Sequence, residues 1–303
     1  MRSFLAFFGL ILVTLAAATV LAWPGYALLA PHFDVRFHRV ASRIWMLLLL
    51  AGFVLVARRL GVADRASLGF GLPRRAFLRE LLLALGLGVA TMTPIVLAMF
   101  ALGLREMRPD VVLQAATIAA LLAKGLATGI TVALIEETFM RGAMQTGIQR
   151  ESGALVAVAL ISVIYAATHF LSSYKIPPEQ LGPGSGVALL AGSLRAFAQP
   201  LGIADAFLCL FAVGVLLGMV RALTGHIAAC MGLHAGWVWV IQFVRESSRP
   251  VEGIPLRWLV SQFDGVVGWL VLAWTLVIGV ALLVIYRRRG AGLVSDVRSL
   301  PRA

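Results

Sequence analysis

ALIEETFMRG, residues 133–142, places two adjacent glutamates and an arginine inside a stretch whose surroundings are typical of a membrane-spanning helix. Charged side chains are costly in the hydrocarbon core of a bilayer, and those that occur there usually serve a function. The stretch therefore raises two questions at once: whether the chain is a membrane protein, and what the three charges do in it.

The composition answers the first question. Of the 303 residues, 60% are hydrophobic and 13% are charged, whereas soluble domains have roughly 25% charged residues. The formal net charge of +12 is typical of basic residues that flank spans and meet anionic lipid, so we expect a lipid bilayer and no nucleic acid as partner. Cys209 and Cys230 lie in apolar segments and indicate neither a disulfide framework nor a cysteine-rich metal site.

The apolar runs predict an all-α fold, a polytopic membrane helix bundle with about eight transmembrane helices in a single integral membrane domain, residues 1–303. The expected spans are Phe4–Trp23, Ile44–Ala57, Leu81–Leu104, Ala127–Thr146, Leu155–Phe170, Leu201–Val220, Ile227–Val244 and Val266–Tyr286. Val111–Leu122 is either the outer half of a long fourth helix or a separate interfacial helix. The first span also resembles the apolar part of a signal peptide, and both interpretations stay open.

Two of the linkers are long. Arg58–Arg79 carries six arginines and, with the basic tail after the last span, favours cytoplasmic termini by the positive-inside rule. Leu171–Pro200 contains PPEQLGPGSG, whose Pro and Gly oppose regular helix, and it is either a lid for substrate access or a plain connector. The predominance of arginine over lysine indicates a GC-rich bacterial source, and for a membrane protein from such a source we expect the inner membrane.

Intramembrane ionisable residues occur in three of the expected spans. Glu136, Glu137 and Arg141 lie in the fourth span, His169 near the end of the fifth, and His234 in the seventh. Each has a structural interpretation, since charged pairs often form ion-pair networks and single histidines are often hydrogen-bonded core residues. Their occurrence together favours a shared site.

The turn between spans four and five is expected at Arg150–Gly153. Glu136 precedes it and His169 follows it by about 16 residues, roughly 24 Å along each helix, so an antiparallel hairpin brings both to one depth. His234 lies only about nine residues past the turn at residues 224–225, roughly 14 Å, and fits that depth less well. We therefore expect Glu136 and His169 to face one shared water or ion.

The two glutamates have different expected roles. Glu137 and Arg141 are spaced i, i+4 in the favourable orientation, so we expect an ion pair that occupies Glu137. Glu136 points about 100° away on the same helix and is the carboxylate that can meet a histidine from span five. A carboxylate and imidazoles around one water are suited to hydrolysis, with Glu136 as general base. The same residues, Glu136, His169 and His234, would be the ligands if a divalent metal such as zinc is bound, although the HExxH spacing is absent.

The chain resembles a known family in these motifs. EETFMR matches the EExxxR signature of the CPBP family, which comprises CAAX proteases and bacteriocin-processing enzymes and is also called the type II CAAX prenyl endopeptidase or ABI family. YAATH, residues 165–169, is similar to its second motif, FxxxH, and HAGWV, residues 234–238, to its third, HxxxN. The order and spacing agree over a motif core of about residues 131–240.

The resemblance implies an eight-helix intramembrane endopeptidase that cleaves a membrane-associated or lipidated peptide or protein. It implies Glu136 as general base, Glu137 and Arg141 as its support, His169 as a residue that holds the water, and His234 as the oxyanion donor. It leaves metal dependence, the substrate and its prenylation, and the face to which the site opens undetermined. Oligomeric state is undetermined as well.

The chain departs from the pattern at Val238, where Asn is usual. Loss of an oxyanion-hole group costs about 2.7–4 kcal/mol of transition-state stabilisation, and Gln242 or Arg245, further along the same helix, are the candidates to compensate. Val238 also supports a non-catalytic immunity or scaffold protein that retains the fold. A third alternative is a proton-coupled carrier, because intramembrane Glu and His form proton relays, but the internal repeat common in transporters is absent.

Overall fold

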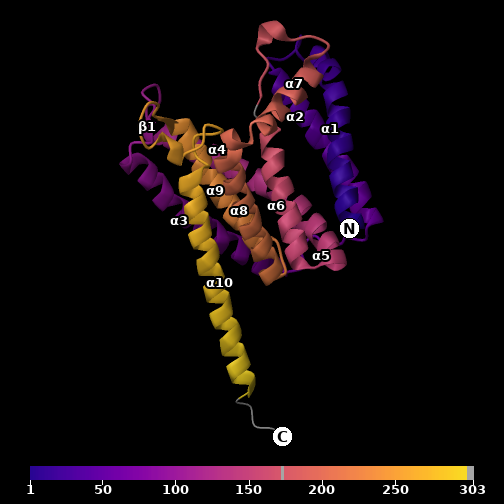
Figure 1. The fold of residues 1–303 in the computed structure, drawn as a ribbon, viewed down its shortest axis with the longest axis vertical. Coiled ribbons are helices and arrows are strands. Elements are labelled where there is room, and N and C mark those ends of the chain that lie inside the picture. Colours follow the sequence, from indigo (N-terminus) through magenta and orange to yellow (C-terminus); the bar gives the residue numbers. More distant parts are fainter. Residues whose placement is uncertain (172–173, 299–303) are drawn as a thin grey trace.

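The computed structural model describes residues 1–171 and 174–298, and for residues 286–298 only the course of the helix. Its described part is a helix bundle with one short sheet (Figure 1). The helices are α1 (Arg2–Leu29), α2 (Phe37–Arg59), α3 (Arg74–Ala101), α4 (Ala115–Glu137), α5 (Gln145–Ser152), α6 (Ala154–Phe170), α7 (Ser185–Leu194), α8 (Pro200–Thr224), α9 (Ala228–Ser247) and α10 (Trp269–Arg298). A π-helical segment, η1 (Thr138–Met144), joins α4 to α5, and short 3-10 turns lie at Pro178–Gln180, Arg195–Ala198 and Arg257–Leu259.

The all-α membrane bundle is confirmed. Each of the eight expected spans overlaps a helix, although the bounds differ by a few residues and the fourth span covers the end of α4, η1 and the start of α5. Within the described residues, five continuous helical segments are long and apolar enough to cross a membrane, and three shorter apolar helices accompany them, Ala154–Phe170, Ser185–Ala198 and Trp269–Ile285. The number of helices that cross the bilayer stays a prediction.

The helix boundaries decide one open point of the sequence, the course of Val111–Leu122, and they place a helix in Leu171–Pro200 without deciding between a lid and a connector. α4 begins at Ala115 and continues through η1 and α5 to Ser152, so Val111–Leu122 contributes the outer part of a long fourth helix. Leu171–Pro200 contains a helix that the sequence did not predict, α7, which starts within the final Ser-Gly of PPEQLGPGSG. α7 packs on α1, where the backbone of Gly186 closely approaches the carbonyl of Thr19.

α9 lies between α3 and α4 and packs closely against both. A Cβ atom on Gly236 of α9 would lie 2.6 Å from the Leu85 carbonyl oxygen of α3, and one on Gly129 of α4 would lie 2.5 Å from the Ala235 carbonyl oxygen of α9. Small residues let membrane helices approach to backbone contact, where packing replaces the missing hydrophobic driving force. These contacts therefore set the position of α9, on which His234 lies.

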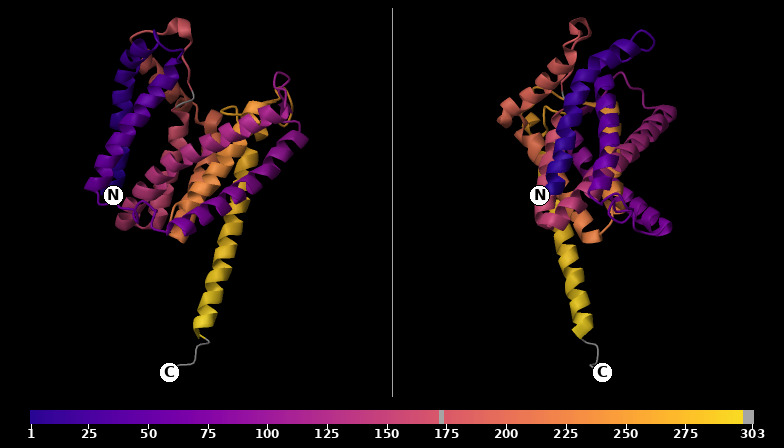
Figure 2. Two further views of the ribbon diagram at one scale, coloured as in Figure 1. Left: turned by 180° about the vertical axis from the view of Figure 1, so that it is seen from behind. Right: turned by 90° about the vertical axis from the view of Figure 1, so that its right-hand side faces the viewer.

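Both expected turns end at a glycine in the left-handed region. Gly153 (φ +83°) separates α5 from α6, and Gly225 (φ +75°) caps α8. The first turn belongs to a polar end of the bundle, where Glu151 accepts from the Met1 amine at 2.6 Å and Arg150 donates to the Gly61 carbonyl at 3.1 Å. Figure 2 shows the start of α1 and the α5–α6 turn at this end.

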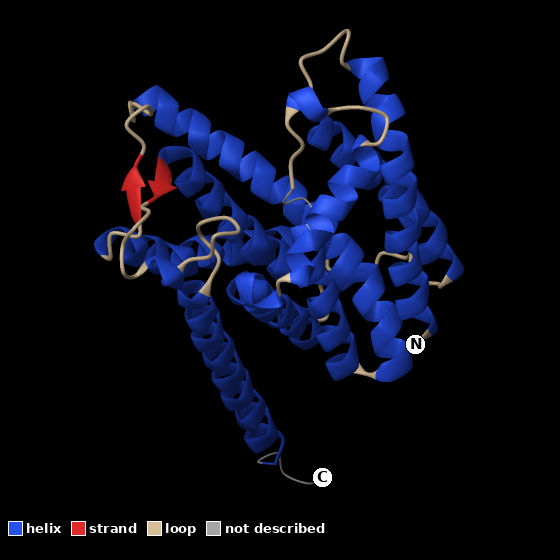
Figure 3. Ribbon diagram, turned by 45° about the horizontal axis from the view of Figure 1, so that its top comes forward, coloured by secondary structure: helices blue, strands red, loops and turns tan. Residues whose placement is uncertain are grey.

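Strands β1 (Arg105–Met107) and β2 (Ser248–Pro250) pair antiparallel, with Glu106 opposite Arg249 (Figure 3). The Arg105 side chain is buried and donates to the Gly265 carbonyl oxygen at 2.7 Å and to the Ser248 hydroxyl at 3.0 Å. The sheet ties the end of α3 to the end of α9. Three-residue strands are too short to show an alternating pattern, which is why the sequence did not predict them.

The glycine contacts generate a stability prediction. Gly88→Ala should destabilise the protein by about 1–3 kcal/mol, the usual cost of overpacking, because its Cβ would lie 2.6 Å from the Leu233 carbonyl oxygen. Gly86→Ala, on the same helix, is the matched control, since its Cβ would meet no atom within 4 Å. Thermal unfolding in detergent, followed by size-exclusion chromatography, measures both. Equal melting temperatures for the two variants would contradict the close approach of α3 and α9.

Candidate active site

The glutamates lie where the helix type changes. Glu136 and Glu137 are the last residues of α4, and Arg141 lies inside η1, whose hydrogen bonds run from residue i to i+5. The sequence predicted a regular α-helix through this stretch, so the π-helical turn is a correction. π-helical turns are frequent at functional sites. Gly142 within η1 allows the loop residue Leu68 to approach, since a Cβ there would lie 2.8 Å from the Leu68 carbonyl oxygen.

The expected pair of Glu137 and Arg141 is present. Arg141 Nη1 donates to Glu137 Oε1 at 3.1 Å, and both side chains have zero exposure. A buried charge is tolerated when it is paired and hydrogen-bonded. Removal of either side chain would therefore leave the other charge buried without a partner.

His234 is the histidine that meets the glutamates. Its Nδ1 lies 2.8 Å from Glu137 Oε1, and its Nε2 lies 3.9 Å from Glu136 Oε2. This corrects the expectation that His234 would fit the site less well. In Figure 2, α3 and α4 run obliquely to α10. When helices are inclined differently, an equal number of residues from a turn does not place two residues at the same depth in the bundle.

His169 enters the same network through Tyr165. Its Nδ1 lies 2.7 Å from the Tyr165 carbonyl oxygen, and the two ring centroids are 4.5 Å apart. A carbonyl oxygen only accepts hydrogen bonds, so we assign a proton to Nδ1. The expected shared water or ion between Glu136 and His169 stays a prediction.

α8 supplies contacts that the sequence did not predict. Arg141 Nη2 donates to the Gly214 carbonyl oxygen at 3.4 Å, and Gln145 donates to the Gly218 carbonyl oxygen at 2.9 Å. Arg221 of α8 donates to the backbone carbonyl of Arg141 at 3.0 Å. A backbone carbonyl oxygen cannot be identified as an acceptor from the sequence. The presence of Arg141 and Gln145 one turn apart in an apolar span did indicate that polar partners lie opposite them.

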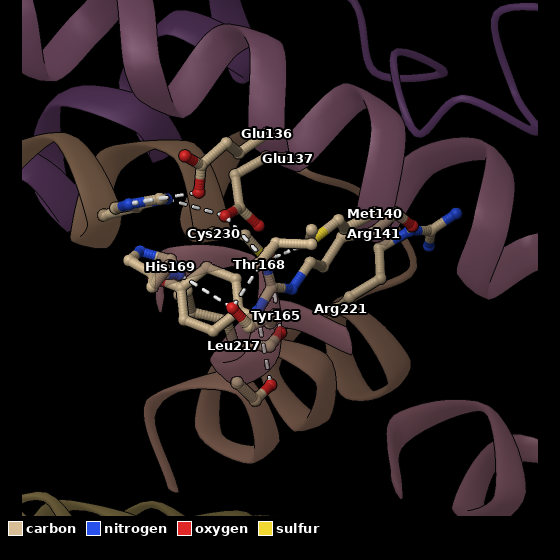
Figure 4. A network of polar contacts seen from close by, with 12 residues as sticks. Glu136, Glu137, Met140, Arg141, Tyr165, Thr168, His169, Leu217, Arg221 and Cys230 are labelled. Atoms are coloured by element: carbon tan, nitrogen blue, oxygen red, sulfur yellow. Dashed lines mark hydrogen bonds and ion pairs between the residues drawn. The ribbon is translucent and has the colours of Figure 1, made fainter. Parts of the chain in front are cut away.

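The network thus joins all five predicted residues, four of which are labelled in Figure 4: Glu136, Glu137, Arg141 and His169. Glu137 contacts Arg141 and His234 directly, whereas His169 is connected through Tyr165, whose ring centroid lies 6.2 Å from that of His234. The Glu136 side chain is 30% exposed, and its Oε2 atom is buried without a hydrogen-bond partner among the described residues. Glu137 Oε2 is buried without a hydrogen-bond partner as well, but Glu137 Oε1 contacts Arg141 and His234, so Glu136 is the glutamate that makes no hydrogen bond to the described residues.

The proposed substitutes for the usual Asn lie far from His234 along α9. Gln242 follows His234 by eight residues and Arg245 by eleven, about 12 and 16 Å of helix rise, and Arg245 is exposed near the end of the helix. Neither reaches the depth of His234 on its own helix. The side chain that holds the His234 ring here is Glu137.

A three-ligand zinc site needs His, Cys, Asp or Glu side chains that converge on one point. Across the described residues, no group of three or more His, Cys, Asp and Glu side chains is arranged to hold a metal ion. Nδ1 of His169 is directed to a carbonyl oxygen and Nδ1 of His234 to Glu137, which is also how metal-ligating histidines are commonly oriented for binding through their other nitrogen. Glu136, His169 and His234 stay the residues that would hold a metal ion if one is bound.

The buried pair generates a prediction. Arg141→Ala leaves the Glu137 carboxylate buried without its cation, so it should lower the free energy of unfolding by about 3–5 kcal/mol. Glu136→Ala should cost less, because Glu136 is partly exposed. Lys124→Ala, which breaks the exposed Lys124–Glu246 pair, is a control with an expected effect of about 0–1 kcal/mol. Thermal unfolding in detergent measures all three, and equal losses for Arg141→Ala and Glu136→Ala would contradict the division of roles.

Comparison with known proteins agrees with the motifs. Residues 118–240 match a family model described as type II CAAX prenyl endopeptidase Rce1-like. No curated protein and no solved structure matches the chain. The matched range is less than half of the chain, yet it contains Glu136, Glu137, Arg141, His169 and His234. The part of the chain that forms the network therefore matches the family that its motifs resemble, the type II CAAX prenyl endopeptidases.

Proposed function

We propose that the protein is an intramembrane endopeptidase that hydrolyses a peptide bond of a membrane-associated peptide or protein. The observation that carries the proposal is the position of Glu136 Oε2, which is buried, has no hydrogen-bond partner among the described residues, and lies 3.9 Å from His234 Nε2. A water molecule between a carboxylate and an imidazole can be deprotonated and directed at a carbonyl carbon. The family match supports peptidase activity in a membrane.

In the proposed reaction, Glu136 takes a proton from water, and the water oxygen attacks the carbonyl carbon of the scissile bond. The carbonyl oxygen becomes an oxyanion. Glu136 then gives its proton to the leaving nitrogen as the carbon–nitrogen bond breaks, which releases a carboxylic acid and an amine. The protonated carboxyl group returns to a carboxylate, so proton and bond changes balance without a further reactant.

The surrounding groups have distinct tasks in this scheme. Glu137, held by Arg141, accepts from His234 Nδ1 and stabilises a positive charge on that ring, so the Nε2–H group can donate to the oxyanion. The Nδ1 contact to the Tyr165 carbonyl oxygen holds the His169 ring in place, and this ring is the second imidazole that helps to hold the water. No step passes through a metal ion.

The setting that we propose is the bacterial inner membrane, with both termini in the cytoplasm. The start of α1 and the C-terminal part of α10 lie toward the same end of the bundle (Figure 1). Arg58, Arg59, Arg65, Arg74, Arg75 and Arg79 are exposed in the α2–α3 region, whose loop contacts Arg150. Basic residues at this end agree with the positive-inside rule.

The proposal predicts that Glu136→Gln abolishes cleavage while the protein stays folded. Gln keeps the shape of Glu but cannot take a proton, so general-base catalysis, about 10²- to 10⁴-fold in rate, is lost. Membrane proteomes of strains that carry wild type or Glu136→Gln should differ by an accumulating precursor, which identifies the substrate. Glu246→Gln, at an exposed carboxylate, is the matched control. If wild type and Glu136→Gln complement a deletion equally, the protein is non-catalytic or a carrier.

Val238 generates a second prediction. Val238→Asn places a hydrogen-bonding side chain one turn after His234, and an added oxyanion-stabilising group is worth up to about 2.7–4 kcal/mol. We expect cleavage of the accumulated precursor to rise or to stay equal, because Glu137 already holds the His234 ring. A fall in the cleavage rate with unchanged thermal stability would show that the apolar side chain at this position is required.

A further inference from the structure

Tyr165 is a buried residue of the network to which the proposed reaction gives no task. It lies on α6, one turn before His169, and is 3% exposed. Its ring contacts three of the five predicted residues: the Arg141 guanidinium carbon lies 4.7 Å from its centroid, and the centroids of His169 and His234 lie at 4.5 and 6.2 Å. Tyr165 therefore lies between residues from α6, α9 and η1.

These contacts have the geometry of favourable aromatic and cation–π pairs. Both histidine rings meet the Tyr165 ring edge-to-face, with interplanar angles of 60° and 77°, and aromatic pairs prefer this arrangement at centroid distances of about 4.5–7 Å. The guanidinium over the ring is a cation–π contact. The ring thus limits how far each imidazole can rotate or move toward the other.

Tyr165 also acts on His169 through its backbone. The Tyr165 carbonyl oxygen accepts from His169 Nδ1 at 2.7 Å, which fixes the tautomer and the ring orientation. One residue therefore holds both the plane and the proton position of His169. The same carbonyl would be present with any side chain at position 165, so only the ring contacts depend on tyrosine.

The Tyr165 ring supports the His234 imidazole, because the next turn of α9 offers that imidazole no polar partner. One turn further along α9 stands Val238, which has no donor or acceptor in its side chain. The supports of the His234 imidazole are Glu137, which meets Nδ1, and the Tyr165 ring, which meets its edge. Glu137 fixes one point of the imidazole, and a second contact is needed to fix the direction of Nε2.

We propose that Tyr165 is a positioning residue of this site: its ring separates His169 and His234 and holds the Nε2 atom of His234 toward Glu136. The role in catalysis rests on the proposed endopeptidase function, whereas the positioning of the two imidazoles does not. The contribution is made by the ring, so phenylalanine should largely replace tyrosine and an aliphatic side chain should not.

The test compares Tyr165→Leu, Tyr165→Phe and Phe7→Leu with wild type in detergent. Phe7 is fully buried against Phe53 and Phe139, so its replacement removes a buried ring away from the histidines. Diethyl pyrocarbonate modifies accessible imidazoles, and mass spectrometry gives the rate at each histidine, with the exposed His32 as internal reference. This readout needs no substrate.

We expect Tyr165→Leu to raise the modification rate of His234 about tenfold, because a buried imidazole reacts only when its surroundings open. Tyr165→Phe should restore most of the protection, and Phe7→Leu should lower the melting temperature without raising the rate. An unchanged rate in Tyr165→Leu would overturn the proposal, as would an equal rise in Phe7→Leu. A rise in Tyr165→Phe as large as in Tyr165→Leu would assign the role to the hydroxyl and overturn the proposal for the ring.

Cleavage of the precursor that accumulates with Glu136→Gln provides the catalytic readout. Tyr165→Leu should lower kcat up to about 10²-fold, the cost of a displacement of about 1 Å at a reacting group, with a much smaller change in KM. Tyr165→Phe should recover most of kcat. If no precursor accumulates, the endopeptidase proposal fails, and the modification rates still decide whether Tyr165 holds the imidazoles.

Discussion

The Glu137–Arg141 ion pair is the contact on which the arrangement of the other site residues depends. Both side chains are wholly buried, and in a medium of low dielectric neither charge is tolerated without the other. The carboxylate also meets His234, while the guanidinium lies over the Tyr165 ring and donates to a carbonyl oxygen of α8. Helices α4, α6, α8 and α9 therefore meet at one pair of opposite charges, and a displacement of α6, α8 or α9 would remove a ring, carbonyl or imidazole contact from one of the two charges.

The helices can approach this pair closely because glycines, which have no side chain, lie on their contact surfaces. Gly88, Gly129, Gly232 and Gly236 have no side chain where α3 and α4 meet α9, and a Cβ atom at each would meet a backbone oxygen of the neighbouring helix. Inside a bilayer, apolar side chains gain little by leaving lipid for protein, so close packing and polar contacts must hold helices together. The glycines flank His234 and bring it within reach of residues at the end of α4.

Two adjacent glutamates acquire different surroundings in this arrangement. Glu137 is fully buried, and its Oε1 atom lies between a guanidinium and an imidazole, whereas Glu136 is partly exposed and makes no hydrogen bond to the described residues. The change from α-helix to π-helix follows directly after them. Neighbouring carboxylates in unlike environments are the usual basis for separate tasks in one site, one of them electrostatic and the other in proton transfer.

The fold class and the candidate residues could be predicted from the sequence, because the cost of a charge in hydrocarbon and the length of an apolar run are properties of single segments. The Glu137–Arg141 pair was predictable for the same reason, since its members lie one turn apart. The π-helical turn, the α8 carbonyls and the central place of Tyr165 were not, because they depend on segments far apart in the chain. The sequence by itself determined that Glu136, Glu137, Arg141, His169 and His234 belong to a membrane-embedded helix bundle. Only the tertiary structure decided that His234 meets both glutamates, because that contact depends on the inclination of the helices and on backbone contacts at glycine.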